Sequence, residues 1–367
     1  MSQLYFWVFL LSFLRPVSQS HGAPGGRGAR EYARAISILK SPSTKPGQSA
    51  RRAASLLERA CSAGHQPACN ALAGVLINQL SEERGGLNEA RLSDPHAPEA
   101  LKLRRAISLY ETACDSNYSA ACYNLSHAYA EGAFVQHEPA YALRFAKRAC
   151  ALNDAEGCLL EGRLHKELTP KLTKPRLLAW EKSCTIRAGA GGCVALARYY
   201  QPLNGSLERH LALRFAERGC EGGSGQSCVT ASAIFDARGE GDRAEVLLSR
   251  ACEGERVEGC AGLAARQAMR GEDSTATLQR GCEGRSMQSC AALAAQLLER
   301  QEDEAQAKAA QLAKLACDAE VPEGCYTLYL VRKRSQTHGS DRRALRALAQ
   351  RACRGGVRAA CAALVGH

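Results

Sequence analysis

The chain has 367 residues, with 48 Lys and Arg against 37 Asp and Glu, which gives a net charge of +11 at neutral pH. After the N-terminus no segment is apolar over a membrane-spanning length, so no transmembrane segment is expected in the mature chain. Nucleic acid is not expected as a partner, because aromatic residues are not interleaved with the basic ones and no nucleic-acid-binding module is recognisable. The basic balance indicates an anionic partner (a glycan, a lipid headgroup or an acidic protein) or arginines that only solvate helix surfaces.

The N-terminal residues predict a secretory signal peptide. Leu4 to Leu14 form an apolar run of about 11 residues, too short to cross a membrane but typical of a signal-peptide core. Small residues predict cleavage near Ser20, so we assign residues 1–20 to the signal peptide and residues 21–28 to a flexible leader. Because the start carries no Lys or Arg, an N-terminal helix that is buried or lies at an interface is the alternative.

Residues 29–61 predict a degenerate first repeat that caps the rest. A helical pattern at 29–40 is interrupted by the segment 41–47, and a second helical segment then runs to Cys61. We assign residues 62–367 to a solenoid of repeats. Within it, the polar segment at about 82–98 lengthens the first interval between cysteine pairs and is predicted to be an inserted surface loop.

All 18 cysteines fall into nine local pairs. Seven residues separate the two cysteines in eight pairs and eight residues separate them in one: Cys61/Cys69, Cys114/Cys122, Cys150/Cys158, Cys184/Cys193 (the longer one), Cys220/Cys228, Cys252/Cys260, Cys282/Cys290, Cys317/Cys325 and Cys353/Cys361. An even number of cysteines behind a signal peptide predicts disulfides and an oxidising compartment, secreted or periplasmic. Zinc is the rival interpretation, but zinc sites favour closer cysteines and histidines.

The residues around each pair predict a helical hairpin. Positions eight, five, four and one before the first cysteine are apolar or small, which is the stripe of an amphipathic helix. A polar or Gly-rich loop follows, and after the second cysteine leucine recurs three residues on, with Glu161 and Ala231 as exceptions. Each pair is therefore expected to join the end of one helix to the first turn of the next. Closing such a nine-residue loop should stabilise the fold by about 2.5 kcal/mol.

The spacing of successive pairs, roughly 30 to 36 residues, is typical of a solenoid of stacked helix hairpins. Two repeats, which end at Cys252 and Cys282, are short, so their internal turns at 238–242 and 270–273 are predicted to be tight. The fold class is therefore all-α.

The segment 121–150 resembles a Sel-like repeat, a relative of the tetratricopeptide repeat. The matching residues are Ala121, Leu125, Ser126, Tyr129, Gly132, Val135 and Ala142. The cysteine pairing resembles the cysteine-rich secreted branch of that family, the Hcp-type proteins described as β-lactamase-like. The resemblance implies a right-handed superhelix of helix pairs whose concave surface holds protein complexes together. It also brings in an enzyme as the alternative, since some relatives bind or hydrolyse β-lactams.

Motifs for catalysis or metal binding are weak or absent. A serine β-lactamase needs Ser-x-x-Lys together with Ser-Asp-Asn and Lys-Thr-Gly; Ser37 and Lys40 match the first motif, and the other two do not occur. The nine histidines show no HExxH or HxH spacing: His21, His65, His96, His127, His137, His165, His210, His338 and His367. No catalytic residue, cofactor or metal site is predicted, and most histidines are expected in solvent or in loops.

Aromatic and amide side chains after the second cysteines are the remaining candidates for ligand contact. Five tyrosines either pack between helices, which we favour, or line a binding groove: Tyr123, Tyr199, Tyr200, Tyr326 and Tyr329. Asn70 and Asn124 are placed for ligand contact. The leading hypothesis is a secreted or periplasmic interaction scaffold without catalysis, which binds protein on its concave face. The alternatives are a β-lactam-binding or weakly hydrolysing protein, and a relative of mitochondrial factors that assist respiratory-complex assembly, against which the apolar N-terminus argues.

Overall fold

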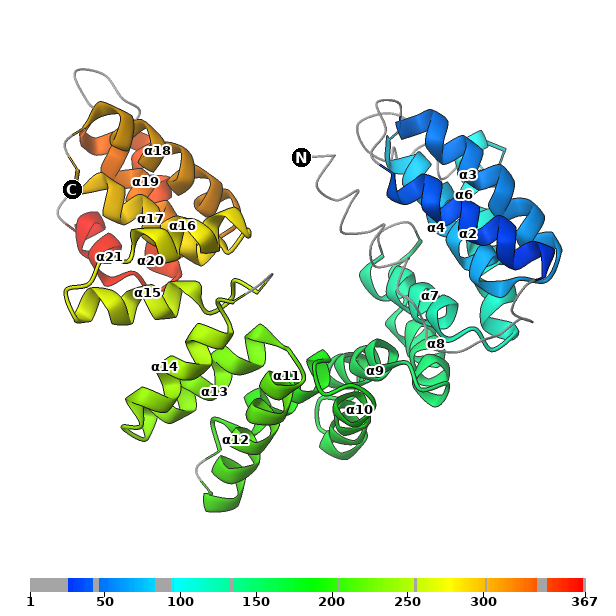
Figure 1. Cartoon of the computed structure of the whole chain (residues 1–367), viewed down its shortest axis with the longest axis horizontal. Helices are drawn as coiled ribbons and strands as arrows, with labels where there is room; N and C mark the ends of the chain where they lie inside the picture. Colours follow the sequence, from blue (N-terminus) through cyan, green and yellow to red (C-terminus); the bar gives the residue numbers. More distant parts are fainter. Residues whose placement is uncertain are drawn as a thin grey trace. The chain divides into compact units, whose positions relative to one another are not determined.

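The structure is a computed structural model that describes residues 26–41, 46–82, 94, 96–132, 135–203, 205–253, 256–300, 302–334 and 342–365. These residues form 19 α-helices and include no strand, so the predicted all-α class is confirmed (Figure 1). The predicted signal peptide, most of the leader and most of the 82–98 loop lie outside the described residues. None of the described helices is long and apolar enough to cross a membrane.

The chain divides into two compact units, Met1–Gly192 and Cys193–His367. The helices of the first unit are α2 (Arg27–Lys40), α3 (Pro46–Ser62), α4 (Gln66–Glu82), α6 (Pro98–Asp115), α7 (Ser119–Glu131), α8 (Pro139–Ala151), α9 (Ala155–Leu168) and α10 (Thr173–Ile186). Helix α2 begins at Arg27, so it includes the last two residues assigned to the leader. Helices α2 and α3 form the predicted first hairpin and pack against each other.

Helix α11 (Gly191–Tyr200) begins at the boundary, and the second unit continues from it. Its other helices are α12 (Ser206–Glu221), α13 (Gly225–Ala237), α14 (Gly241–Arg250), α15 (Cys260–Met269), α16 (Thr275–Glu283), α17 (Met287–Leu298), α18 (Asp303–Asp318), α19 (Pro322–Arg334), α20 (Arg342–Arg354) and α21 (Arg358–Val365). We call α11, α13, α15, α17, α19 and α21 row A, and α12, α14, α16, α18 and α20 row B. Row A helices hold the second cysteine of a pair, and α17 packs against its row A neighbours α15 and α19.

Small residues on the predicted stripe bring the two helices of a hairpin together. Ala142, Ala146 and Ala149 of α8 are fully buried, as are the matching residues of α3, α6 and α18. Opposite Ala149 stands Gly157, where a Cβ atom would lie 2.5 Å from the Ala149 Cβ. Neither side has room for a larger side chain, and this close approach at the end of the hairpin lets the cysteines meet, with Cα atoms 4.4 Å apart in Cys150–Cys158.

One turn recurs between the paired cysteines, and it explains their spacing. The third residue after the first cysteine is left-handed in seven turns: Gly64, Asn117, Asn153, Gly223, Arg285, Glu320 and Gly356. Its N–H donates to the carbonyl of the first cysteine at 2.8–3.0 Å, and the next N–H donates to the carbonyl before that cysteine at 2.8–3.1 Å. This is the Schellman end of a helix, which satisfies its last carbonyls.

The same turn also starts the following helix. The fourth residue after the first cysteine is the N-cap, and in three repeats its side chain accepts a hydrogen bond from a backbone N–H of that helix: Asp154 from Gly157, Ser224 from Ser227 and Ser286 from Ser289. Such caps are worth about 1 kcal/mol each. Three residues separate α8 from α9, α12 from α13 and α16 from α17. The seven-residue interval therefore places the second cysteine in the first turn of the following helix.

Candidate functional site

The cysteines are placed as local bridges between consecutive helices. Eight pairs have Sγ–Sγ bonds and Cα–Cα distances of 4.4–4.7 Å: Cys61–Cys69, Cys114–Cys122, Cys150–Cys158, Cys220–Cys228, Cys252–Cys260, Cys282–Cys290, Cys317–Cys325 and Cys353–Cys361. Cys184 and Cys193 are also disulfide-bonded, and no free cysteine is found among the described residues. The expected local pairing of adjacent helices is confirmed, and the cysteines serve architecture.

A glutamate replaces the recurring leucine in one repeat. Leu72, Leu125, Leu196 and Leu293, each three residues after a second cysteine, are at most 3% exposed. In α9 the same position holds Glu161, whose side chain is 17% exposed. Burial raises the pKa of the Glu161 carboxyl, against the nearby positive charges of Lys147 and Lys182. An ionisable group therefore stands where the repeat otherwise has core.

His165 accompanies Glu161 one helical turn later. Its Nε2 lies 3.8 Å from Oε1 of Glu161, and its residue is 8% exposed. Burial lowers the pKa of His165, and Lys147 lowers it further. Its Nδ1 is buried and has no hydrogen-bond partner. The expectation that most histidines lie in solvent or loops is thus wrong for this one, because its position in α9 corresponds to the buried Phe235 and Leu297 of other repeats.

Trp180 of α10 packs beside this pair, against a position with no side chain. A Cβ atom on Gly162 of α9 would lie 2.3 Å from the Trp180 indole, so only glycine fits there. Trp180 is 7% exposed, and the guanidinium of the buried Arg176 lies 5.5 Å from its ring centre. Glu161, His165 and Trp180 form a polar and aromatic cluster inside the first unit, which we call the α9–α10 cluster.

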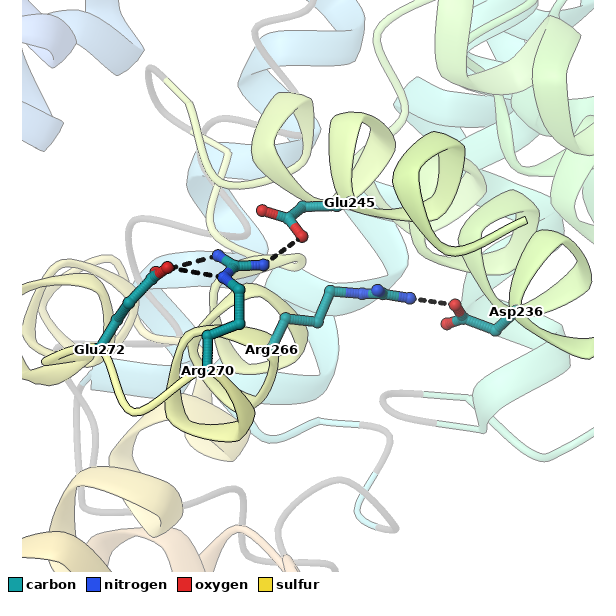
Figure 2. Close-up of polar contacts among 5 residues, drawn as sticks. All are labelled: Asp236, Glu245, Arg266, Arg270 and Glu272. Atoms are coloured by element: carbon teal, nitrogen blue, oxygen red, sulfur yellow. Dashed lines mark hydrogen bonds and ion pairs between the residues drawn. The ribbon is translucent and has the colours of Figure 1, made fainter. Parts of the chain in front are cut away.

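In the second unit, Figure 2 shows Arg266 of α15 and Arg270 just after it, each bound to carboxylates. Arg270, which follows α15, donates to Glu245 of α14 at 2.6 Å and to both oxygens of Glu272 at 2.6 and 2.9 Å. Arg266 pairs with Asp236 of α13. These hydrogen bonds raise the pKa of Arg270 further and lower that of Glu272. Three consecutive helices are therefore joined by a network of ion pairs.

Arginine–carboxylate pairs at repeat spacing recur elsewhere. Arg148 donates to Asp115 at 2.7 Å, and Arg163 donates to Glu131 at 3.2 Å. Single exposed pairs contribute little, typically less than about 1 kcal/mol. Their value here is to set the register between neighbouring repeats. The interpretation that arginines only solvate helix surfaces is therefore incomplete.

The tyrosine and asparagine candidates mostly serve packing. Tyr329 is buried, its ring centre is 6.0 Å from that of Tyr326, and Tyr200 stacks on Phe215 at 6.1 Å. Asn124 Nδ2 donates to Asn70 Oδ1 at 2.9 Å, and both residues are at most 8% exposed. The assignment of the two asparagines to ligand contact is wrong, because they bond to each other across adjacent repeats.

The remaining chemical candidates do not come together. Ser37 and Lys40 are both exposed on α2. Among the described residues no group of three or more His, Cys, Asp or Glu side chains could hold a metal ion. What sequence reasoning missed is the α9–α10 cluster. Its signal was visible, since Glu161 breaks the leucine pattern, and His165 follows it by one helical turn.

Comparisons with known proteins agree on the fold. No family model matches the chain. A Sel1 repeat protein from Oxalobacter formigenes has a TM-score of 0.50 at 16% identity, over 97% of this chain and 98% of that one. A protective antigen of uropathogenic Escherichia coli strains that displays an SLR fold has a TM-score of 0.47 at 16% identity, over 92% and 79% of the chains. The first likeness shows a Sel1-type repeat fold.

Two curated proteins match a short part of the sequence. Cytochrome c oxidase assembly factor 7 of Xenopus tropicalis is 38% identical over 80 residues, and assembly factor 7A of Xenopus laevis is 35% identical over 80 residues. The match covers 22% of this chain and 33% of each relative. The chain thus spans about a third of the length of the curated relatives it matches.

Proposed function

We propose that the protein is a rigid interaction scaffold that works in an oxidising compartment, secreted or periplasmic, after removal of its signal peptide. The observation that carries this proposal is the set of local disulfides, which bridge the turns between consecutive helices in both units. Such bridges persist where thiols are not kept reduced. They hold short helices in place without a large apolar core, so that the exposed side chains of successive repeats form a preorganised surface.

The partner is proposed to be a protein that docks on row A, which is proposed here as the concave surface implied by the family resemblance. Helices α13, α15 and α17 each expose the side chain five residues after the second cysteine: Ala233, Ala265 and Ala295. Equivalent positions of successive repeats line up in a solenoid, so these residues follow one another along one face. Their small side chains leave the backbone of each helix open to close contact.

The test compares two triple variants in the same repeats. The row A variant carries Ala233→Arg, Ala265→Arg and Ala295→Arg. The control carries Val246→Arg, Ala276→Arg and Ala307→Arg, at exposed positions of the row B helices α14, α16 and α18. Partners are captured by crosslinking the mature chain in its native compartment. The row A variant should lose them and the control should keep them, with unchanged melting temperatures. Equal capture by both variants contradicts docking on row A.

An assembly role is the more specific form of this proposal. It is supported by the local likeness to two cytochrome c oxidase assembly factors. The captured partners should then include subunits of a membrane-bound enzyme complex, and deletion of the protein should lower the amount of the assembled complex, measured on native gels. A normal amount of every such complex would restrict the role to a scaffold of another kind.

The alternative is a β-lactam-binding or weakly hydrolysing protein of the Hcp-type branch, which rests on the resemblance of the cysteine pairs. Purified mature protein should show no repeated turnover of a chromogenic cephalosporin if the scaffold proposal is right. Many turnovers per molecule would overturn it. In that case Ser37→Ala is the first variant to measure, because Ser37 and Lys40 are the one Ser-x-x-Lys match.

A further inference from the structure

Basic residues are concentrated in one part of the second unit. Residues 324–367 contain eight arginines and one lysine against a single acidic residue, Asp341, a net charge of +8. Residues 201–323 contain 14 basic and 20 acidic residues, a net charge of −6. The excess positive charge of the unit therefore lies almost entirely in the segment that contains α20 and α21.

Six of these eight arginines have no carboxylate partner among the described residues. Arg334 and Arg351 donate to main-chain carbonyls, of Leu298 and Cys317, each at 2.7 Å. A second group is exposed and makes no hydrogen bond or ion pair with any described residue: Arg342, Arg346, Arg354 and Arg358. In the preceding repeats Arg243, Arg266 and Arg270 each bind a carboxylate, although other arginines there do not. Residues 324–367 differ from those repeats in having almost no acidic side chains to offset their charge. An anion for the four arginines must come from outside the described part of the chain.

The fold holds these cations on one side of a fixed helix. Leu348, Ala349 and Ala352 of α20 are buried against α19 and α21. At about 100° per residue, Arg342, Arg346 and Arg354 lie within about 120° of one another around the helix. Arg354 lies opposite the buried stripe, Arg346 to the side of it and Arg342 at its edge, two turns before Ala349. Packing against both neighbours and the Cys353–Cys361 bridge hold α20 in place. Like charges held together repel each other, and a bound anionic surface relieves this repulsion.

We propose that the exposed side of α20, together with Arg358 at the start of α21, binds the surface of a membrane that contains anionic phospholipids. We call it the basic face. A guanidinium matches the geometry of a phosphate better than an ammonium does, and arginine supplies eight of the nine cations. The helix spans about 20 Å. Cations spread over that length fit a plane of many phosphates better than one small anion.

Two observations favour lipid over other polyanions. Protein interfaces are anchored by aromatic or large apolar side chains, and in residues 342–364 no such side chain is among the exposed ones. Single-stranded nucleic acid requires aromatic side chains on which bases stack, and α20 and α21 have none. Because the apolar side of α20 is committed to the core, binding is peripheral and electrostatic, without insertion into the bilayer.

The test is sedimentation of the mature chain with vesicles of phosphatidylcholine, alone or mixed with phosphatidylglycerol. The basic-face variant carries Arg342→Gln, Arg346→Gln, Arg354→Gln and Arg358→Gln. The control removes the same charge from the same unit at four exposed arginines that bind no carboxylate among the described residues: Arg209→Gln, Arg218→Gln, Arg250→Gln and Arg280→Gln. Each basic residue near an anionic surface contributes about a fivefold gain in affinity. The basic-face variant should therefore bind the mixed vesicles at least about 100-fold more weakly, while the control changes less than about tenfold.

The outcomes separate this proposal from its rivals and from the scaffold. Wild-type binding should weaken steeply with salt and be absent for phosphatidylcholine alone. Equal losses in the two variants, binding to neutral vesicles, or tighter binding to duplex DNA or polyglutamate than to mixed vesicles would overturn it. Circular dichroism checks that both variants are folded. The proposal does not depend on row A docking, because partner capture and vesicle binding are measured separately.

Discussion

At position 161 a glutamate stands where other repeats have leucine, and its effect on the stability of the folded state depends on pH. Burial raises the folded-state pKa of Glu161 above its unfolded value. The stability that such a group contributes is fully present below the unfolded pKa and is lost as pH rises through the folded pKa. Burial therefore disfavours the charged form of Glu161, and the stability of the folded state falls as pH rises through its folded-state pKa. The α9–α10 cluster thus holds an ionisable group at a position where burial opposes its charge.

We predict that Glu161→Leu raises the free energy of unfolding by about 1–3 kcal/mol at neutral pH, because it removes a buried charge and restores the repeat's leucine. The gain should shrink as pH falls toward 4. Urea unfolding followed by Trp180 fluorescence at both pH values measures it. Glu181→Leu, at an exposed position of α10, is the control. A gain for Glu161→Leu that does not change with pH would show that the carboxylate is not destabilised by burial.

His165 should affect stability with the opposite pH dependence from Glu161. Its folded-state pKa lies below its unfolded value, so its contribution is fully present above the unfolded pKa and is lost as pH falls through that value toward the folded pKa. The charged groups that the structure places around it are Glu161 on its own helix and Lys147 of α8. We predict that His165→Phe, which restores an aromatic residue found at this position in α13, flattens the loss of stability between about pH 7 and 5. An unchanged slope in acid melts would exclude His165 as its source.

The sequence predicts that a turn joins two helices between paired cysteines, but it does not predict the backbone conformation of that turn. The spacing predicted a helix end, a tight turn and a helix start. It did not show that the third residue is left-handed, because Gly, Asn, Arg and Glu all occupy that place.

The hydrogen bond between Asn70 and Asn124 and the ion pairs of Figure 2 join successive repeats. Periodicity within one repeat does not encode the register between two, so these contacts were missed.

Glu320 places a non-glycine residue in the left-handed conformation of the turn, and the resulting strain can be tested. Its φ is +63°, a conformation that costs a non-glycine residue about 1–2 kcal/mol. Glycine removes this strain but adds about 0.5–1 kcal/mol of unfolded-state entropy. We predict that Glu320→Gly stabilises the protein by up to about 1 kcal/mol in thermal melts, and that Gly64→Ala destabilises it. Destabilisation by Glu320→Gly would mean that the side chain at this position matters more than its backbone conformation.

The bridges make a further prediction for the oxidised protein. Peptide mapping without reduction should find only local pairs, including Cys184 with Cys193, and thiol titration of the denatured chain should find no free cysteine. The physical reason is the short loop that each pair closes, which makes local pairing the least costly in chain entropy. Long-range links would contradict the arrangement, since helices several repeats apart cannot bring their cysteines within bonding distance.

At the scale of the molecule, a stack of repeats distributes stability locally. Each hairpin contacts mainly its neighbours, so a lesion in one repeat should weaken that repeat and those beside it. The all-α class and the hairpin repeat could be predicted because the cysteine pair and its flanking helical pattern recur nine times in the sequence. The excess of arginine around α20 is also visible in the sequence, but its meaning required the structure. The contacts of Arg334 and Arg351 with main-chain carbonyls, for example, distinguish arginines used within the fold from exposed ones such as Arg346 and Arg354.

Removal of one bridge tests this locality. In a Cys282→Ser, Cys290→Ser variant the loop between α16 and α17 is open in the unfolded chain, which should cost about 2.5 kcal/mol for that hairpin. Hydrogen exchange followed by mass spectrometry should show faster exchange in α16 and α17, a smaller increase in α15 and α18, and none in α7 to α9. The equivalent variant at Cys150 and Cys158 should move the effect to α8 and α9. Faster exchange throughout the chain in both variants would instead indicate that the repeats unfold as one cooperative body, in which each bridge stabilises all of them.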